Sequence, residues 1–176
     1  MSKVIASRTK SVLPNIIHHN QTGYVKDRFI GETIQSIYDI MDYTVKENIP
    51  GLLIFIDFEK AFDSVEWDFL FKCLEAFNFG SDFLHWIKTF YKNVQSCIIN
   101  NGTASNYFPL ERDVRQGDLL SPYLFIVVVE TLAIAIRQNQ EIRGISIENE
   151  DSKILQYAHA DDTTAVLLDI SSAEQL

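Results

Sequence analysis

The chain has 176 residues, of which 47% are hydrophobic and 22% are charged. This length and composition are typical of one globular domain that buries a core of its own. We see no uninterrupted apolar stretch of the roughly 18 to 20 residues that a membrane span needs, and no apolar core of a secretory signal peptide. We therefore expect a soluble intracellular protein, in the nucleus or cytoplasm, that is neither secreted nor bound to a membrane.

The formal net charge is −9, which argues against a nucleic-acid partner because phosphate contacts require lysine and arginine. The argument weakens if acidic residues here bind metal ions and the basic surfaces lie in other parts of a larger protein. The two cysteines, Cys73 and Cys97, have no metal-ligand spacing and are interpreted as ordinary thiols.

Apolar residues at three- and four-residue steps predict a helix over about 29–47, which Pro50 and Gly51 bring to an end. The inward face of this helix is expected to carry Ile30, Ile34, Ile37, Met41 and Val45. The uninterrupted apolar run 52–56 follows and suits a central strand that is buried on both faces. Asp57 would stand at the end of that strand.

Three further helices are predicted over 64–77, 81–91 and 121–138. Ser81 and Asp82 are expected to cap the second of them, and Ser121 with a first-turn proline the third. Residues 94–110 indicate a hairpin, because the Asn-Asn-Gly sequence at 100–102 is a strong turn signal.

The C-terminal part of the chain is expected to form three strands, over 144–148, 153–158 and 163–168. Residues 171–174 then match a capping box for a helix that the chain stops before completing. We therefore expect a fragment or a truncated copy of a longer protein.

Three aspartates follow or interrupt these apolar strands: Asp57, Asp161 and Asp162. Taken singly, each is most simply a turn former in contact with water. Gathered at the tips of neighbouring strands, the three would repel one another unless a cation were present. Magnesium suits such a site because it prefers hard oxygen ligands and is often held by one or two carboxylates together with substrate phosphates.

Four ordered segments decide between these interpretations. They are QTGYVKDRFIGE at 21–32, FIDFEKAFDSVEW at 55–67, RDVRQGDLLSPYLF at 112–125 and QYAHADDTTAVLLD at 156–169. They resemble, in order, a fingers motif and three palm motifs of the reverse transcriptases of non-LTR, LINE-type retrotransposons. The resemblance implies an α+β fold, the right-hand polymerase palm with an antiparallel sheet backed by helices. Residues 1–50 would be part of the fingers and 51–176 part of the palm, with the thumb absent.

The same resemblance implies a catalytic metal site. Asp57 and Asp161 would be the metal ligands, with Asp162 beside them and the backbone carbonyl of Phe58 as an added oxygen. Two Mg²⁺ ions would be bound, with Mn²⁺ as a possible substitute. Asp63 is interpreted as a local structural carboxylate.

Nucleotide binding is implied for Lys26, Arg28, Phe62, Arg115, Gln116 and Gly117. Phe62 matches the aromatic gate that packs under the sugar and rejects a 2′-hydroxyl. The two fingers cations would hold the triphosphate, and the 115–117 loop would contact the incoming nucleotide and the template.

The implied reaction extends a DNA primer with deoxynucleoside triphosphates on an RNA template, within a parent polyprotein that also has an endonuclease and a thumb. The alternative is a catalytically inactive retrotransposon remnant or an RNA-binding palm module. A third interpretation is an intron-encoded maturase, although the wording at 55–67 favours the retrotransposon branch.

This chain departs from the family pattern in the second and third palm motifs. His159 and Ala160 separate Tyr157-Ala158 from the aspartates, where the family has Tyr-Ala-Asp-Asp. Either two residues are inserted, which a bulge or a shifted hairpin must absorb, or His159 replaces the tyrosine. We expect His159 to face the far side of the sheet in preference to acting as a metal ligand or proton shuttle. In the second motif, an aspartate and a leucine stand where the family usually has glycine and proline: Asp113 and Leu119.

Overall fold

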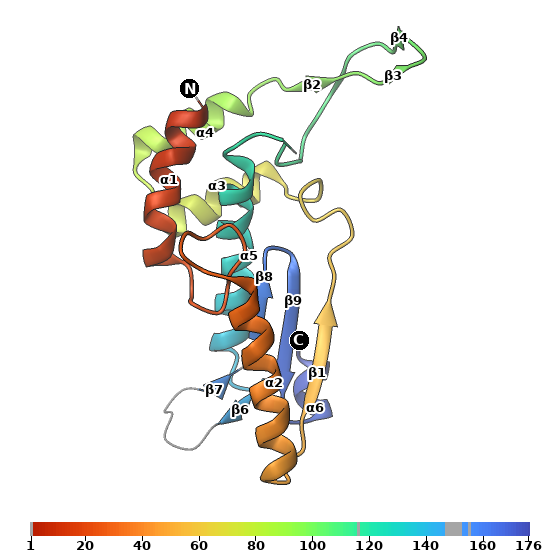
Figure 1. Ribbon diagram of the computed structural model, residues 1–176. Helices are drawn as coiled ribbons and strands as arrows, with labels where there is room; N and C mark the ends of the chain where they lie inside the picture. The colour runs from red at the N-terminus through yellow and green to blue at the C-terminus, as the bar shows by residue number, and fades with distance from the viewer. Residues whose placement is uncertain (1, 116, 147–152, 155) are drawn as a thin grey trace.

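A three-stranded antiparallel sheet lies beside α2 and α5, away from the end of the molecule that carries β3 and β4 (Figure 1). The computed structural model describes residues 2–115, 117–146, 153–154 and 156–176. The strands are arranged in the order β1 (Leu52–Ile56), β9 (Asp162–Leu167) and β8 (Gln156–His159). The prediction that 52–56 is a central strand is therefore wrong, because β9 is central and β1 pairs with β9 alone among the described strands. Phe55 of β1 is accordingly 73% exposed.

Helices cover both faces of this sheet, which gives the predicted α+β architecture. On one face, α5 (Ser121–Gln138) and α6 (Ile170–Glu174) meet alternate residues of the strands, among them the fully buried Ala165 and Leu167. On the other face, α2 (Ile30–Lys46) places Ile40 against Val166. Period-two alternation along the strands therefore separates an α5 face from an α2 face.

Helix α5 is also the hub of a second, larger core. It packs against α1 (Ser2–Ile16) and α3 (Trp67–Ala76), and α3 in turn packs against α4 (Ser81–Phe90). The predicted inward residues of α3 and α4, such as Leu70, Leu74 and Ile87, are buried. Cys73 lies in this core, and both cysteines are free thiols, as predicted.

Helix α1 has no counterpart in the sequence prediction. Its buried residues are Ala6, Thr9 and Leu13, so only one of the three is a large apolar side chain. Pro14 also lies inside the helix, where proline is normally a helix breaker. A helix buried through small and polar residues leaves a weak hydrophobic period, and for that reason the pattern went unnoticed.

Helix α2 forms where it was predicted, but its buried face differs. Thr33 and Ile40 are its buried residues, whereas the expected inward residues Ile34, Met41 and Val45 are 48%, 43% and 82% exposed. The described part of the chain leaves this apolar stripe uncovered. The prediction of the buried face is therefore wrong, although the helix itself is confirmed.

Short strands complete the fold. The predicted hairpin is confirmed by the pairing of β2 (Gln95–Ser96) with β5 (Phe108–Pro109) and of β3 (Ile99–Asn100) with β4 (Thr103–Ala104). Its turn residues Asn101 and Gly102 both have positive φ, 49° and 78°, which suits this sequence. Figure 1 shows the hairpin as an arm that projects away from the helices. Strand β6 (Ile145–Ser146) pairs with β7 (Lys153–Ile154), and the predicted turn between them lies outside the described residues.

The helix starts were predicted less accurately than the helices. The N-cap residues of α4 and α5 are Gly80 and Leu120, and neither makes a side-chain capping bond. Helix α6 is capped by Asp169, whose carboxylate accepts a hydrogen bond of 2.8 Å from the backbone N–H of Ser172. The predicted caps at 81–82, at 121 and at 171 are therefore wrong.

One helix of the described residues, α5, is long and apolar enough to cross a membrane by length and composition. The sequence prediction had found no such stretch. Half of its 18-residue window is buried inside the protein, between the sheet, α1 and α3. A core helix of a soluble protein has the same composition, so the apolar character of α5 is accounted for by its central position.

Main-chain hydrogen bonds join the loop after β1 to the loop before α5. The N–H of Asp113 donates to the carbonyl of Val65 and that of Val114 to Phe62, each at 3.0 Å. The indole N–H of Trp67 donates to the carbonyl of Asp113 at 2.9 Å. Asp113 is held here at a φ of 110°, in a region that favours glycine. The family glycine that Asp113 replaces is thus explained by the backbone.

The Asp113 side chain is poorly accommodated. Its Oδ1 is buried and has no hydrogen-bond partner. Burial raises the pKa of this carboxyl, and the negative charge of Asp63 raises it further. Backbone strain and an unpaired carboxylate oxygen therefore coincide at one residue.

The end of α1 is tied to the segment that follows it by Arg28. The guanidinium donates to four main-chain carbonyls, those of Pro14, Ile17, His18 and Gln21. Burial lowers the pKa of His18 from 6.5 to about 4, and the charges of Arg137 and other neighbours add to the effect. His18 is consequently neutral at pH 7.

We predict that Asp113→Gly raises the free energy of unfolding by about 1–2 kcal/mol, because glycine adopts a φ of 110° without strain. The measurement is urea unfolding at pH 7. Asn101→Gly is the matched control, since Asn101 at a φ of 49° already lies where asparagine is tolerated. Equal effects of the two substitutions would contradict the strain at Asp113.

We predict that protonation of His18 lowers the free energy of unfolding as the pH falls. Its folded pKa of about 4 is below the unfolded value of 6.5, so the stabilising neutral form is fully present above pH 6.5 and is lost toward pH 4. Urea unfolding across this window should show a steeper loss for the wild type than for His18→Gln. The exposed His85 supplies the control, because His85→Gln should retain the wild-type slope.

Candidate active site

The aspartates lie at adjacent strand tips, as the sequence predicted. The register of β1 and β9 pairs Ile56 with Thr163, and its continuation by one residue sets Asp57 opposite Asp162. Asp162 opens β9, and Asp161 precedes it in the turn from β8. Asp57 and Asp162 are exposed and Asp161 is half-buried. Two carboxylates from different motifs, Asp57 and Asp162, are thus exposed to solvent at the same end of the sheet.

The hairpin that carries Asp161 and Asp162 is regular. Strand β8 pairs with β9 without interruption from Gln156 opposite Ala165 to His159 opposite Asp162. No bulge or shift absorbs extra length over these described pairs. His159 is therefore the last strand residue before the Ala-Asp-Asp turn, the place that tyrosine occupies in the family motif. Of the two interpretations given above, the structure favours the replacement of the tyrosine.

The expected orientation of His159 is wrong. Residues directly opposite each other in an antiparallel pair project to the same face, and His159 is opposite Asp162. It therefore shares the aspartate face instead of the far side. Its Nδ1 lies 3.1 Å from the hydroxyl oxygen of Thr22, so this ring nitrogen already has a protein partner.

A loop of the fingers motif holds the other side of the hairpin. Gln21, which is 4% exposed, exchanges hydrogen bonds with Ala160: its Oε1 accepts from the N–H at 2.9 Å and its Nε2 donates to the carbonyl at 3.0 Å. The hydroxyl of Thr22 donates to the carbonyl of Ala158 at 3.2 Å. Gly23 passes so close that a Cβ there would lie 2.1 Å from the nitrogen of Ala160. Neither the hydrophobic pattern nor the motif resemblance predicts a role for these three residues.

Phe62 has a fixed position in the loop after β1. Its ring stacks on Phe125 of α5 at a centroid distance of 4.4 Å and an interplanar angle of 15°. Phe58, whose carbonyl was predicted as a metal ligand, packs partly buried against the same core. The predicted aromatic gate, Phe62, is thus a half-buried ring whose position is fixed by stacking on Phe125 of α5. Its contact with a sugar stays a prediction.

The predicted nucleotide-binding residues are in different environments. Arg115 is exposed, and Gly117 has a φ of 90° with open space around the position of a Cβ. Gln116 lies outside the described residues. Lys26 is exposed and is 3.5 Å from the carboxylate of Asp27. Arg28 donates to four main-chain carbonyls through its two terminal nitrogens, which gives it a structural role that the sequence did not reveal.

The chemistry of the oxygen donors at the strand tips suits magnesium. Asp57, Asp161 and Asp162 are hard oxygen ligands at an open edge, and Mg²⁺ is commonly bound by one or two carboxylates with substrate phosphates and water. Among the described residues, no group of three His, Cys, Asp or Glu side chains is gathered closely enough to hold a metal ion by itself. The three aspartates are therefore not gathered as closely as was expected, and a site at these described residues would be one that substrate phosphate and water oxygens complete, not a closed cage of protein ligands.

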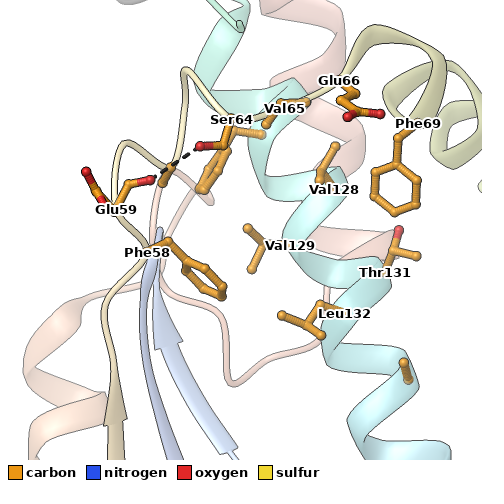
Figure 2. Close-up of a pocket in the computed structure, with 13 residues that line it drawn as sticks. Phe58, Glu59, Ser64, Val65, Glu66, Phe69, Val128, Val129, Thr131 and Leu132 are labelled. Atoms are coloured by element: carbon orange, nitrogen blue, oxygen red, sulfur yellow. Dashed lines mark hydrogen bonds between the residues drawn. The ribbon is translucent and has the colours of Figure 1, made fainter. Parts of the chain in front are cut away.

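An apolar cleft of about 660 Å³ lies behind the loop after β1, between this loop and α5. Figure 2 shows the ring of Phe58 pointing toward Val129 and Leu132 of α5, with Phe69 at the other side. The hydroxyl of Ser64 donates to the carbonyl of Glu59 across the loop at 3.3 Å. The cleft is not lined by any of the three aspartates, so it is a separate feature from the strand tips.

Comparison with known proteins supports the resemblance drawn from the motifs. The family model "Reverse transcriptase (RNA-dependent DNA polymerase)" matches residues 1–176. The Transposon TX1 uncharacterized 149 kDa protein of Xenopus laevis is 29% identical over 99% of this chain and 13% of its own length. The Pol polyprotein of the R2 retrotransposable element of Popillia japonica is 31% identical over 74% of this chain and 22% of its own.

A solved structure supports the fold. Apo telomerase from Candida tropicalis, truncated from its C-terminal domain, superimposes with a TM-score of 0.65 at 12% identity and covers 99% of this chain and 35% of its own. The chain spans less than a quarter of the length of the two retrotransposon relatives. The predicted fold class and family are thus confirmed. The chain belongs to the reverse transcriptase (RNA-dependent DNA polymerase) family.

Proposed function

We propose that the chain provides the catalytic strands of an RNA-directed DNA polymerase, which transfers a nucleotide from a deoxynucleoside triphosphate to a primer 3′-hydroxyl on an RNA template. The observation that carries the proposal is the register of β9, which sets Asp162 beside Asp57. Two isolated turn-forming aspartates, one in each motif, would not need to lie side by side. Such a reaction takes place inside the cell, where template and nucleotides are found.

Asp57, Asp161, Asp162 and the carbonyl of Phe58 would hold two Mg²⁺ ions. When bound, the ions would lower the pKa of the attacking hydroxyl and stabilise the leaving oxygen. The protein would contribute mainly position and charge, as is usual in phosphoryl transfer.

The remaining predicted contacts concern the nucleotide. The half-buried ring of Phe62 is braced by Phe125, and a braced ring is suited to exclude a 2′-hydroxyl by contact. Arg115 and Lys26 are exposed cations that suit the triphosphate. Arg28 would act indirectly, by holding the segment that carries Lys26 against the end of α1.

The second candidate function is an RNA-binding palm module without turnover. His159 favours it, because it stands where the family tyrosine precedes the aspartates and its Nδ1 is engaged by Thr22. The strained Asp113 in the second palm motif favours it also, because it adds negative charge where a triphosphate would bind.

Primer extension on a poly(rA) template with an oligo(dT) primer, dTTP and Mg²⁺ tests the first candidate. We predict that Asp57→Asn lowers the extension rate by about a thousandfold, because loss of a metal ligand removes about 4 kcal/mol of transition-state stabilisation. Asp68→Asn on the exposed side of α3 is the control and should retain the wild-type rate.

His159→Tyr distinguishes the two candidates. The polymerase is supported if the wild type extends the primer, His159→Tyr increases the extension rate and Asp57→Asn abolishes extension. The absence of extension by both the wild type and His159→Tyr, with poly(rA) binding retained in a filter assay, supports the binding module.

A further inference from the structure

We propose that Gln21 is a positioning residue, which fixes the turn that carries Asp161 and Asp162 by binding the peptide groups of Ala160 and so sets the affinity of the site for its metal ion. The inference rests on the proposed function, since it assigns a role to the metal-binding aspartates. It adds a residue outside the two palm segments, 55–67 and 156–169, that contain the predicted ligands.

The contact is between a side-chain amide and a main-chain residue. Gln21 presents one acceptor and one donor, and Ala160 uses both, at 2.9 Å and 3.0 Å. The same Oε1 accepts from the N–H of Gly23 at 2.8 Å, which fixes the rotation of the amide within its own loop. Two hydrogen bonds therefore join Ala160 to Gln21, and a third fixes the Gln21 amide within its own loop.

The turn has a physical need for such support. Ala160 has a φ of 57°, a left-handed conformation that costs a residue with a Cβ roughly 1 kcal/mol or more. Backbone in such a conformation persists when its surroundings determine it from several sides. Ala160 directly precedes Asp161, so rotation of its peptide groups would redirect both aspartates.

The remaining contacts of this loop act on the same hairpin. Ala158 donates its N–H to the carbonyl of Asn20 and accepts from the N–H of Thr22, each at 2.9 Å, so the segment forms a short parallel bridge along the outer edge of β8. Gly23 allows the main chain to approach the turn, because no room exists for a Cβ beside Ala160. Gln21, 4% exposed and Ala160, 6% exposed, exchange their hydrogen bonds away from water, where such bonds are hardest to replace.

The variants separate the hydrogen bonds of the Gln21 side chain from its volume. Methionine has a similar length and no matching donor or acceptor, so Gln21→Met keeps the volume and removes all three hydrogen bonds. Gly23→Ala perturbs the same turn from the main chain. Ile87→Val is the control for general loss of stability, because Ile87 is fully buried in α4, which packs against α3.

Two measurements on the 176-residue chain test the proposal. The first is the hydrogen-exchange rate of the Ala160 N–H in the metal-free chain. We expect at least a tenfold increase in Gln21→Met and in Gly23→Ala, and less than a twofold change in Ile87→Val. Gln21→Glu should increase the rate as well, because its carboxylate has no donor for the Ala160 carbonyl and would be a buried charge. Gly23→Ala, which keeps the Gln21 amide, gives a result if Gln21→Met does not fold.

The second measurement is Mn²⁺ binding, followed by electron paramagnetic resonance with the metal alone. We expect at least tenfold weaker binding in Gln21→Met and wild-type binding in Ile87→Val. Unchanged exchange at Ala160, or unchanged Mn²⁺ affinity in a Gln21→Met chain whose wild type binds the metal, overturns the positioning role only. If the wild type binds no Mn²⁺, either alone or with dTTP present, and Asp57→Asn behaves identically, the proposed function fails, and the role of Gln21 in metal binding fails with it.

Discussion

The antiparallel register of β9 is the constraint on which the candidate site depends. It pairs Thr163 with Ile56 on one side and with Ala158 on the other. A slip by one residue would turn the side chains of β9 to the opposite face and move the fully buried Ala165 and Leu167 from the α5 face to the α2 face. The burial of Ala165 and Leu167 therefore fixes the register of β9, and that register fixes the position of Asp162 at the start of the strand.

Main-chain hydrogen bonds fix the positions of the loops relative to the sheet. The loop after β1 is tied to the loop before α5 by the N–H groups of Asp113 and Val114, and the fingers segment is tied to β8 through Ala158. Because peptide groups make most of these bonds, the side chains of Asp57, Asp162 and Arg115 are left exposed. This division suits a site whose ligands come from solution, since the scaffold does not consume the functional groups.

The sequence predicted most of the elements because their hydrophobic periods are long and regular. It predicted the neighbouring position of the aspartates because motif resemblance supplied a fold that local patterns lack. It failed where burial is decided by partners: the apolar stripe of α2 at Ile34, Met41 and Val45 is exposed, and the polar Thr33 is buried instead. Periodicity reports that a helix has an apolar side, but only the packing reports which side is covered.

The structural roles of Gln21 and Arg28 could not have been predicted for a related reason. Gln21 binds main-chain groups of Ala160, far away in the sequence, and Arg28 binds the carbonyls of residues that precede it by 7 to 14 positions. In both cases the partner is a peptide group, which carries no residue-specific signal. From sequence alone, the cation Arg28 in this motif therefore resembles a phosphate ligand, while the buried amide of Gln21 in the same motif carries no signal of its role. The partner of a side chain that binds the backbone is fixed by the fold alone.

The two kinds of departure from the family pattern act at different levels of structure. His159 changes a side chain at the end of a strand whose pairing is uninterrupted, so its effect is confined to chemistry on the aspartate face. Asp113 changes the backbone: its φ of 110° and unpaired Oδ1 burden the junction between the loop of Phe62 and the loop of Arg115. A chain with a regular strand register and a strained junction would lose the alignment of the loop that carries Arg115 first. It would lose the fold and the neighbouring position of Asp57 and Asp162 only after that.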